Sequence, residues 1–283
     1  EYTLADTAKN LADVATDDVV QDAQSITLTS AAKVTEAKTL LDNAADLIVG
    51  GYDLTDSAEN LYGAPSAVRN GATDITVTGN ASVVQAIRID GFNNSGETSF
   101  DLQDGALQLV NAPVSLLEKA GDVTFTNGAT TELTVAQATK LAPYLADDIG
   151  FVLNDSGANL TSEDGLALIE QFDSIQILPT TALTLDQVQT LVDLAPTNLQ
   201  PSDVDIEDTA ENLLAAIAPT ETVDALGNST VAQSQAAIDA ETIIDSVISN
   251  GATVTATGDI TIEQATQLLD TNVGNPAIGY SLA

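Results

Sequence analysis

The sequence predicts an α/β fold: a right-handed strand-helix solenoid with parallel strands on one side and helices on the other. Three patterns predict it: an aromatic-led motif about every 50 residues, a β-rich stretch halfway between, and recurring Thr-x-x-Gln helix starts. A unit of this size cannot bury its apolar faces alone, so neighbouring units must stack. The connection from one parallel strand through a helix to the next is expected to be right-handed.

The aromatic-led motif reads Tyr/Phe-x-Leu-x-Asp-Ser/Thr-Ala-x-Asn-Leu and is clearest at Tyr2 and Tyr52. It starts again at positions 100, 151, 204 and 280, which gives intervals of 50, 48, 51, 53 and 76 residues. Five of the ten aromatic residues occupy its leading position, so the spacing is not accidental. We predict a single solenoid over 1–283, with repeats at about 1–50, 51–99, 100–150, 151–203 and 204–279. The last interval is longer by about half a repeat and predicts an inserted half-unit there.

Short stretches with alternating β-branched residues lie midway between the aromatic-led motifs, and this pattern is typical of strands. With the motif strands they give each repeat two strand-helix half-units of about 25 residues. The stretches are Ser25–Thr29, Asp74–Thr78, Asp122–Thr126, Ser174–Leu178 and Thr253–Thr257.

Capping boxes predict where the helices begin, because the first side chain accepts a backbone N–H and the fourth reaches back to the cap. After the caps, apolar spacing such as Val188, Leu191 and Val192 predicts one buried helical face. Asn-Gly pairs at 70–71, 127–128 and 250–251 predict turns. The predicted boxes pair Asp56 with Glu59, Thr134 with Gln137, Thr184 with Gln187, Asp208 with Glu211, Thr230 with Gln233 and Thr261 with Gln264.

The leading aromatic residues are expected to line up one above another as a ladder, interrupted by Val204. Packed apolar ladders are a normal constituent of solenoid cores. We therefore predict a packing role for these side chains rather than ligand stacking.

The composition excludes several partners. With 42 acidic and 7 basic residues the formal charge is -35, so nucleic acid and anionic lipid would be repelled. No apolar run reaches the roughly 18 residues that span a bilayer. We expect the chain to be part of a longer or processed protein. An acidic chain of this kind is a natural ligand for divalent cations.

The motif, the Ile-Thr-Leu-Thr stretch and the Leu-Thr-x-x-Gln-Ala helix start together resemble repeats of large type I-secreted bacterial surface and adhesin-like proteins. The resemblance covers essentially the whole chain and implies an extracellular or cell-surface location with a structural, lattice, spacer or adhesive role. It also implies partners that are neighbouring repeats or further copies, with surface polysaccharide as another possibility. The Gly-Gly-x-Gly-x-Asp calcium repeat that accompanies many such proteins is absent from this sequence.

Catalytic chemistry has few candidates, because the chain has no His and no Cys and so no common triad, thiol nucleophile or zinc site. We expect no enzyme, no catalytic residue and no certain cofactor. Calcium is the possible ligand, with weak candidates in the alternating acids Asp203, Asp205, Glu207 and Asp208. The alternatives are a polysaccharide-binding adhesin face and a carboxylate-based carbohydrate-active enzyme. Self-association end to end is expected because solenoid cross-sections expose strand edges.

Overall fold

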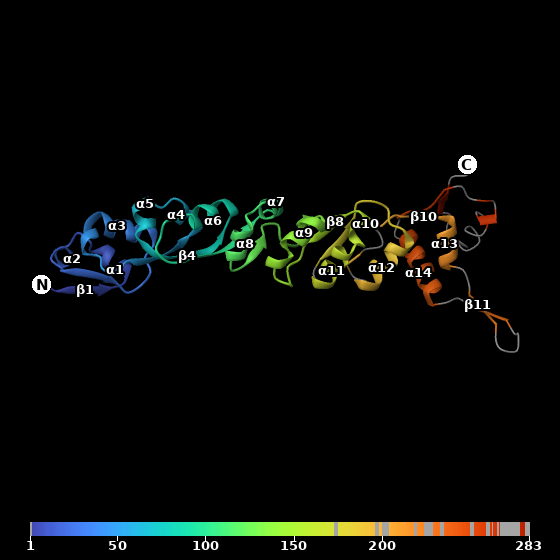
Figure 1. The fold of residues 1–283 in the computed structure, drawn as a ribbon, viewed down its shortest axis with the longest axis horizontal. Coiled ribbons are helices and arrows are strands. Elements are labelled where there is room, and N and C mark those ends of the chain that lie inside the picture. The colour runs from blue at the N-terminus through green and yellow to red at the C-terminus, as the bar shows by residue number, and fades with distance from the viewer. Residues whose placement is uncertain are drawn as a thin grey trace. The chain divides into compact units, whose positions relative to one another are not determined.

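The computed structural model describes most of the chain, and Figure 1 labels its helices and strands. The chain forms two compact units. Unit 1 comprises residues 1–127 with 144–146, and unit 2 comprises 128–143 with 147–283. The residues described are 2–172, 175–195, 198–199, 204–217, 220–223, 229–232, 235–249, 252–258, 261, 263–264, 266 and 278–280. Predictions that concern Ser174, Asp203, Gln233, Asn250 and Gly251 lie outside them.

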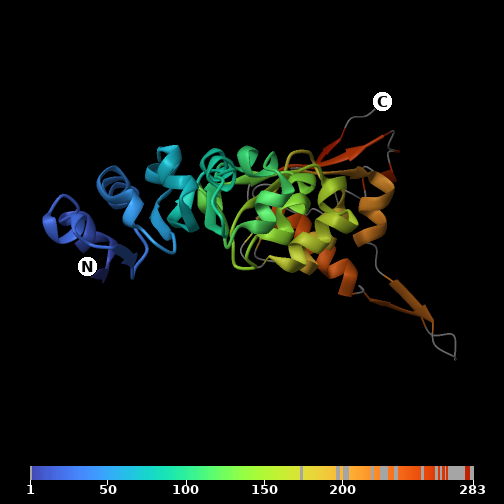
Figure 2. The same cartoon turned by 60° about the vertical axis from the view of Figure 1, so that its left-hand side comes forward.

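In unit 1, helices alternate with parallel strands, and the turned view shows the helices following one another in chain order (Figure 2). The strands are β1 (Thr3–Asp6), β2 (Ser25–Leu28), β3 (Tyr52–Ser57), β4 (Ala72–Ala81), β5 (Thr98–Asp104) and β6 (Val123–Phe125). The helices are α1 (Ala8–Asp13), α2 (Asp18–Gln21), α3 (Val34–Ala44), α4 (Ala58–Tyr62), α5 (Ser66–Asn70), α6 (Val83–Asp90), α7 (Ala106–Val110) and α8 (Val114–Lys119).

Strands of unit 1 pair with the next strand in the chain. β1 pairs with β2, and β3 to β6 form a four-stranded sheet in chain order. An isolated parallel bridge between Ala32 and Leu54 lies between the two sheets. The inward positions of β3 alternate with outward ones, so Tyr52 and Leu54 are buried while Asp53 is exposed. The predicted α/β class with parallel strands is confirmed, and the strands form small, separate sheets.

Unit 2 repeats the alternation of parallel strands with helices. Its strands are β7 (Glu132–Leu133), β8 (Val152–Asp155), β9 (Gln176–Pro179), β10 (Ile206–Thr209), β11 (Thr220–Val223), β12 (Ser229–Ala232), β13 (Val254–Thr257) and β14 (Ile278–Tyr280). Its helices are α9 (Val135–Leu141), α10 (Gly157–Leu160), α11 (Glu163–Gln171), α12 (Leu185–Leu194), α13 (Ala210–Ile217) and α14 (Gln235–Ser249). The parallel sheets are β7-β8-β9 and β10-β13-β14.

The inserted stretch differs from its prediction. Thr230 lies within β12, opposite Thr222 of β11, so it is not a helix cap. The two strands pair antiparallel, and α14 follows them at Gln235. Because β11 and β12 pair only with each other, they add no parallel strand to the sheet in which β10 and β13 pair.

Three of the four predicted Thr-x-x-Gln boxes are confirmed by reciprocal hydrogen bonds. At Thr184 the hydroxyl accepts from Gln187 N at 3.2 Å, and Gln187 Oε1 accepts from Thr184 N at 3.0 Å. The same pair forms at Thr134 and at Thr261. A further box forms at Ser82, where serine replaces the threonine of the Thr-x-x-Gln pattern. Beyond the cap of α12, Leu185, Val188 and Leu191 form the buried face.

Candidate functional site

Carboxylates recur at the fifth position of the aromatic-led motif, where each strand is followed by a helix, and those of Asp56 and Asp208 are buried. Each Oδ1 accepts the N–H of the following residue, at 2.8 Å in the case of Asp56 and Ser57. In four of the five motifs the same oxygen also accepts from an asparagine four residues on, at 2.7 Å from Asn60 to Asp56. The five aspartates are Asp6, Asp56, Asp104, Asp155 and Asp208.

The second oxygen of four of these aspartates bonds to a different helix. Its donor is the N–H of the first residue of the helix that begins 20–23 residues earlier in the chain. The first N–H groups of a helix have no partner within it, and a carboxylate there also complements the helix dipole. The pairs are Val34 with Asp56 at 3.0 Å, Val83 with Asp104 at 3.0 Å, Val135 with Asp155 at 3.0 Å, and Leu185 with Asp208 at 3.1 Å.

We call these four contacts the aspartate clamps: each joins a strand to the helix of the preceding strand-helix segment. They correct the capping boxes predicted at Asp56 and Asp208. The caps lie one residue later, where Ser57 and Thr209 accept from the backbone N–H three residues on, at 3.3 and 3.1 Å. The sequence pattern predicts that each carboxylate caps the helix that directly follows it. A contact with the helix before it cannot be recognised in the sequence, because the two partners are 20–23 residues apart.

Hydrogen bonding outweighs burial at the clamp of Asp155. Burial raises the pKa of this carboxyl group. The hydrogen bonds from the Asn159 amide and from the N–H groups of Ser156 and Val135 together lower it by more, so the pKa lies below its ordinary value. At Asp6 the bonds from Asn10 and Thr7 likewise lower the pKa. Both groups are therefore held as acceptors in the ionised form at neutral pH.

The leading aromatic side chains lie mostly in the core. Tyr52, Phe100 and Phe151 are buried, which confirms the packing role, whereas Tyr2 is exposed. They do not stack directly on one another, because β4 lies between β3 and β5 and places Ala72 opposite Tyr52. The predicted ladder is therefore interrupted at every second strand in this sheet.

Tyr52 has a defined hydrogen bond within the core. Its hydroxyl donates to the carbonyl of Val68, in the middle of α5, at 2.5 Å. Burial raises its pKa to about 12. A Cβ atom at Gly71 would lie only 2.8 Å from this hydroxyl, so the glycine of the predicted Asn70–Gly71 turn makes room for the ring.

The calcium candidates are not brought together. Asp208 is buried and bonded to Leu185, Thr209 and Asn212, whereas Asp205 and Glu207 are exposed on the other face of the β10 segment. Asp205 Oδ1 accepts from both the N–H and the hydroxyl of Thr253, each at 2.8 Å. Asp203 lies outside the described residues. Nowhere in the described part of the chain do three His, Cys, Asp or Glu side chains gather as a metal site.

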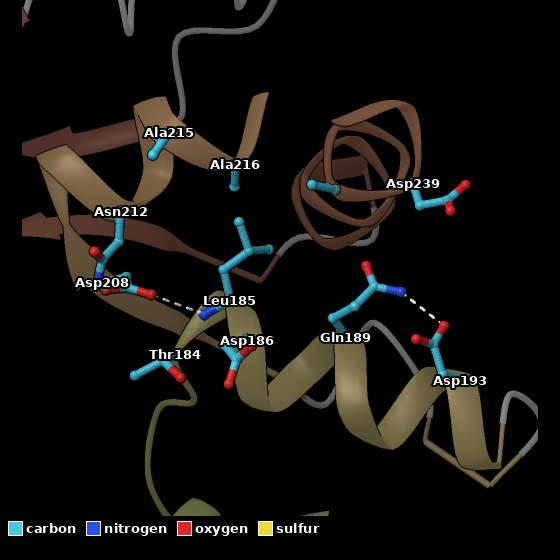
Figure 3. A pocket seen from close by; sticks show the side chains of 11 residues that line it. Thr184, Leu185, Asp186, Gln189, Asp193, Asp208, Asn212, Ala215, Ala216 and Asp239 are labelled. Atoms are coloured by element: carbon cyan, nitrogen blue, oxygen red, sulfur yellow. Dashed lines mark hydrogen bonds between the residues drawn. The ribbon is translucent and has the colours of Figure 1, made fainter. Parts of the chain in front are cut away.

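A groove of about 740 Å³ lies between α12, α13 and α14 of unit 2 (Figure 3). Leu185, Ala215, Ala216 and Ala240 supply its apolar lining. Its carboxylates come from Asp186, Asp193, Asp208 and Asp239. The Asp208 carboxylate turns to the Leu185 N–H, and Gln189 Nε2 donates to Asp193 at 2.7 Å. The lining residues are Thr184, Leu185, Asp186, Gln189, Asp193, Asp208, Asn212, Ala215, Ala216, Asp239 and Ala240, among which there is no aromatic or basic side chain.

No family model and no curated protein matches the chain. Among the helices that the structure describes, none is both long and apolar enough to cross a bilayer.

Proposed function

We propose that the chain is a structural repeat segment of a secreted bacterial cell-surface, extracellular-matrix or filament protein. In this proposal it is a right-handed strand-helix solenoid that associates end to end with further copies. The aspartate clamps carry the proposal. Four equivalent carboxylates are used to join successive strand-helix segments, which is what an array that stacks its repeats requires.

The strand pairing supports the solenoid. Strands separated by a helix pair in parallel and in chain order, for example β3 with β4, β4 with β5, and β8 with β9. Such crossovers are right-handed in almost all proteins. Helices of successive strand-helix segments also contact one another, as α4 does with α6.

The charge supports a role at an ionic, hydrated surface. A formal charge of -35 repels like chains, so association requires screening by salt or bridging by cations. Dispersed binding of calcium by exposed carboxylates would lower this repulsion without a single tight site. Calcium is therefore the cation to test, with Asp205 and Glu207 as exposed candidates.

The groove of unit 2 bears on the alternatives of a polysaccharide-binding face and a carboxylate-based carbohydrate-active enzyme. Its volume is in the range of ligand sites, and its lining combines carboxylates with apolar side chains. Its lining has no aromatic side chain on which a sugar ring would stack. We therefore favour the structural role.

Sedimentation velocity over a concentration series in 0.15 M salt tests the proposal, because the expected association depends on concentration. We expect the weight-average sedimentation coefficient to rise with protein concentration. A single concentration-independent species, together with co-sedimentation of the chain with an added polysaccharide, would favour the adhesin alternative and contradict the proposal.

A further inference from the structure

Both arginines of the chain are stacked on aromatic rings at one place on unit 1, where α4, α5 and α6 are neighbours (Figure 1). The guanidinium of Arg88 in α6 lies over the ring of Tyr62, the last residue of α4, at 4.4 Å from the ring centroid. The guanidinium of Arg69 in α5 lies over the ring of Phe92, just after α6, at 4.8 Å from the centroid. The two contacts therefore join α6 to α4 and α5 in both directions and fix the plane of each guanidinium.

Neither arginine has an acidic partner in the part of the chain that the structure describes. Ion pairs form there from Lys9, Lys38 and Lys119, whereas the two guanidinium groups form no ion pair and donate no hydrogen bond. A guanidinium carries five N–H donors in a planar fork that matches a carboxylate. Stacking covers the face of the group and leaves its edge open. Because Arg88 is exposed, its edge is available to a carboxylate from outside the chain.

Helix α6 also has a second apolar face beside Arg88. Its first face, with Val83, Ala86 and Ile89, is buried in the core. Val84 is 61% exposed and Ile87 is 48% exposed. Residues three and four apart share one side of a helix, so both lie on the same side as Arg88.

The repeat itself does not require these exposed apolar side chains. Helices α3, α9 and α12 begin in the same register as α6, because each receives an aspartate clamp at its first residue. None of them has a large apolar residue at the second or fifth position. Those residues are Thr35 and Lys38 in α3, Ala136 and Thr139 in α9, and Asp186 and Gln189 in α12.

We propose that this surface binds a carboxylate-bearing surface of a second copy of the chain. Arginine and aromatic side chains with apolar neighbours are the composition that interfaces between proteins favour. The charge of the chain makes another copy the complementary partner, since 42 acidic side chains surround two arginines that lack a carboxylate. The inference depends on the proposed self-association and adds a lateral contact to the end-to-end one. We call this surface the arginine patch: Tyr62, Arg69, Val84, Ile87, Arg88 and Phe92.

The contact joins two different surfaces. Two arginine patches facing each other would bring four guanidinium groups together, and like charges across an interface are unfavourable. A contact between unlike surfaces continues from copy to copy when it does not close into a ring. The arginine patch therefore gives the chain a means of side-by-side growth, as a lattice or matrix requires.

Sedimentation velocity of a matched pair of variants tests the role of Arg88. Arg88→Gln removes the guanidinium, and we expect about tenfold more protein to be needed for the same weight-average sedimentation coefficient in 0.15 M salt. Lys38→Gln makes the same change of net charge at an exposed site on α3 and should leave the coefficient unchanged. Equal association of the two variants would show that Arg88 makes no contact between copies.

A second pair tests the apolar face without touching the stacked arginines. Val84→Thr combined with Ile87→Thr introduces the residue that α3 has at the second position and α9 at the fifth, so the fold is kept. We expect about tenfold weaker association. Val49→Thr combined with Val114→Thr changes two other exposed valines and should have no effect. Full association of the Val84 and Ile87 variant would overturn the proposal.

Two further results would assign the arginine patch to another occupant. Since the chain has no cysteine, an 87–87 disulfide dimer of Ile87→Cys would show that the patch binds itself. Co-sedimentation of the native chain, but not of Arg88→Gln, with polygalacturonate would assign the patch to an acidic polysaccharide. Association that every variant retains would overturn the patch and leave the proposed function standing, whereas a native chain that never associates would overturn both.

Discussion

Replacement of Asp56 by alanine tests the energetic role of a clamp. Asp56 is 7% exposed and accepts three hydrogen bonds, from Ser57 N at 2.8 Å, Asn60 Nδ2 at 2.7 Å and Val34 N at 3.0 Å. Asn60 is exposed and Ser57 is half-buried, so water can replace the carboxylate at both donors, but Val34 is 8% exposed and its N–H would be left buried without a partner. Such a donor costs about 1–3 kcal/mol, and the lost charged bonds bring the expected destabilisation to about 2–4 kcal/mol.

Hydrogen exchange at the Val34 amide is the direct assay. A loss of about 2–4 kcal/mol corresponds to exchange that is roughly 30-fold to 900-fold faster, because about 1.36 kcal/mol is a factor of ten. Asp46→Ala removes an exposed carboxylate near the end of the same strand-helix segment and should change stability by less than about 0.5 kcal/mol. If Val34 exchanges equally fast in the two variants, the clamp does not hold the segments together.

Three further predictions concern other parts of the same framework. Tyr52 should ionise near pH 12 in an absorbance titration, and its contribution to stability should be lost as pH rises from about 10, the ordinary tyrosine pKa, to about 12. Tyr52→Phe should abolish this late absorbance change, and its persistence would assign it to another tyrosine. Because the pKa of Asp155 is lowered, its contribution to stability is present above about pH 3.9 and is lost as the pH falls below that value. Asn159→Ala should raise this pKa in a carboxyl NMR titration, and an unchanged pKa would mean that the 2.7 Å hydrogen bond from the Asn159 amide has no effect. Thr184→Ala should destabilise unit 2 by about 1 kcal/mol in urea unfolding because α12 loses its cap, whereas Thr190→Ala within the helix should have little effect, and equal losses would refute the capping argument.

The sequence predicted the features that depend on local spacing. β13 covers Val254–Thr257 within the predicted stretch, and the box at Thr184 forms as expected, because alternation and capping are set by neighbouring residues. The clamp could not be predicted, since Asp208 contacts Leu185, 23 residues away, and nothing in the local pattern distinguishes that contact from an N-cap. The antiparallel pair at Thr230 was missed because the Thr-x-x-Gln pattern also occurs in a strand.

The candidate site was predicted less well than the fold. The alternating acids were grouped by sequence, but alternation along a strand sends Asp205 and Glu207 to one face and Asp208 to the other. The groove between α12, α13 and α14 has no local sequence signal, because its lining comes mainly from three helices that lie far apart in the sequence.

Light and X-ray scattering of the chain, first in chelator and then in millimolar calcium, tests the central claim most directly. The proposal predicts that calcium offsets repulsion among the 42 acidic side chains, so that the mass increases and linear assemblies form. A mass that stays at the 29.0 kDa of one chain at every protein concentration, with and without calcium, would contradict the self-associating structural role.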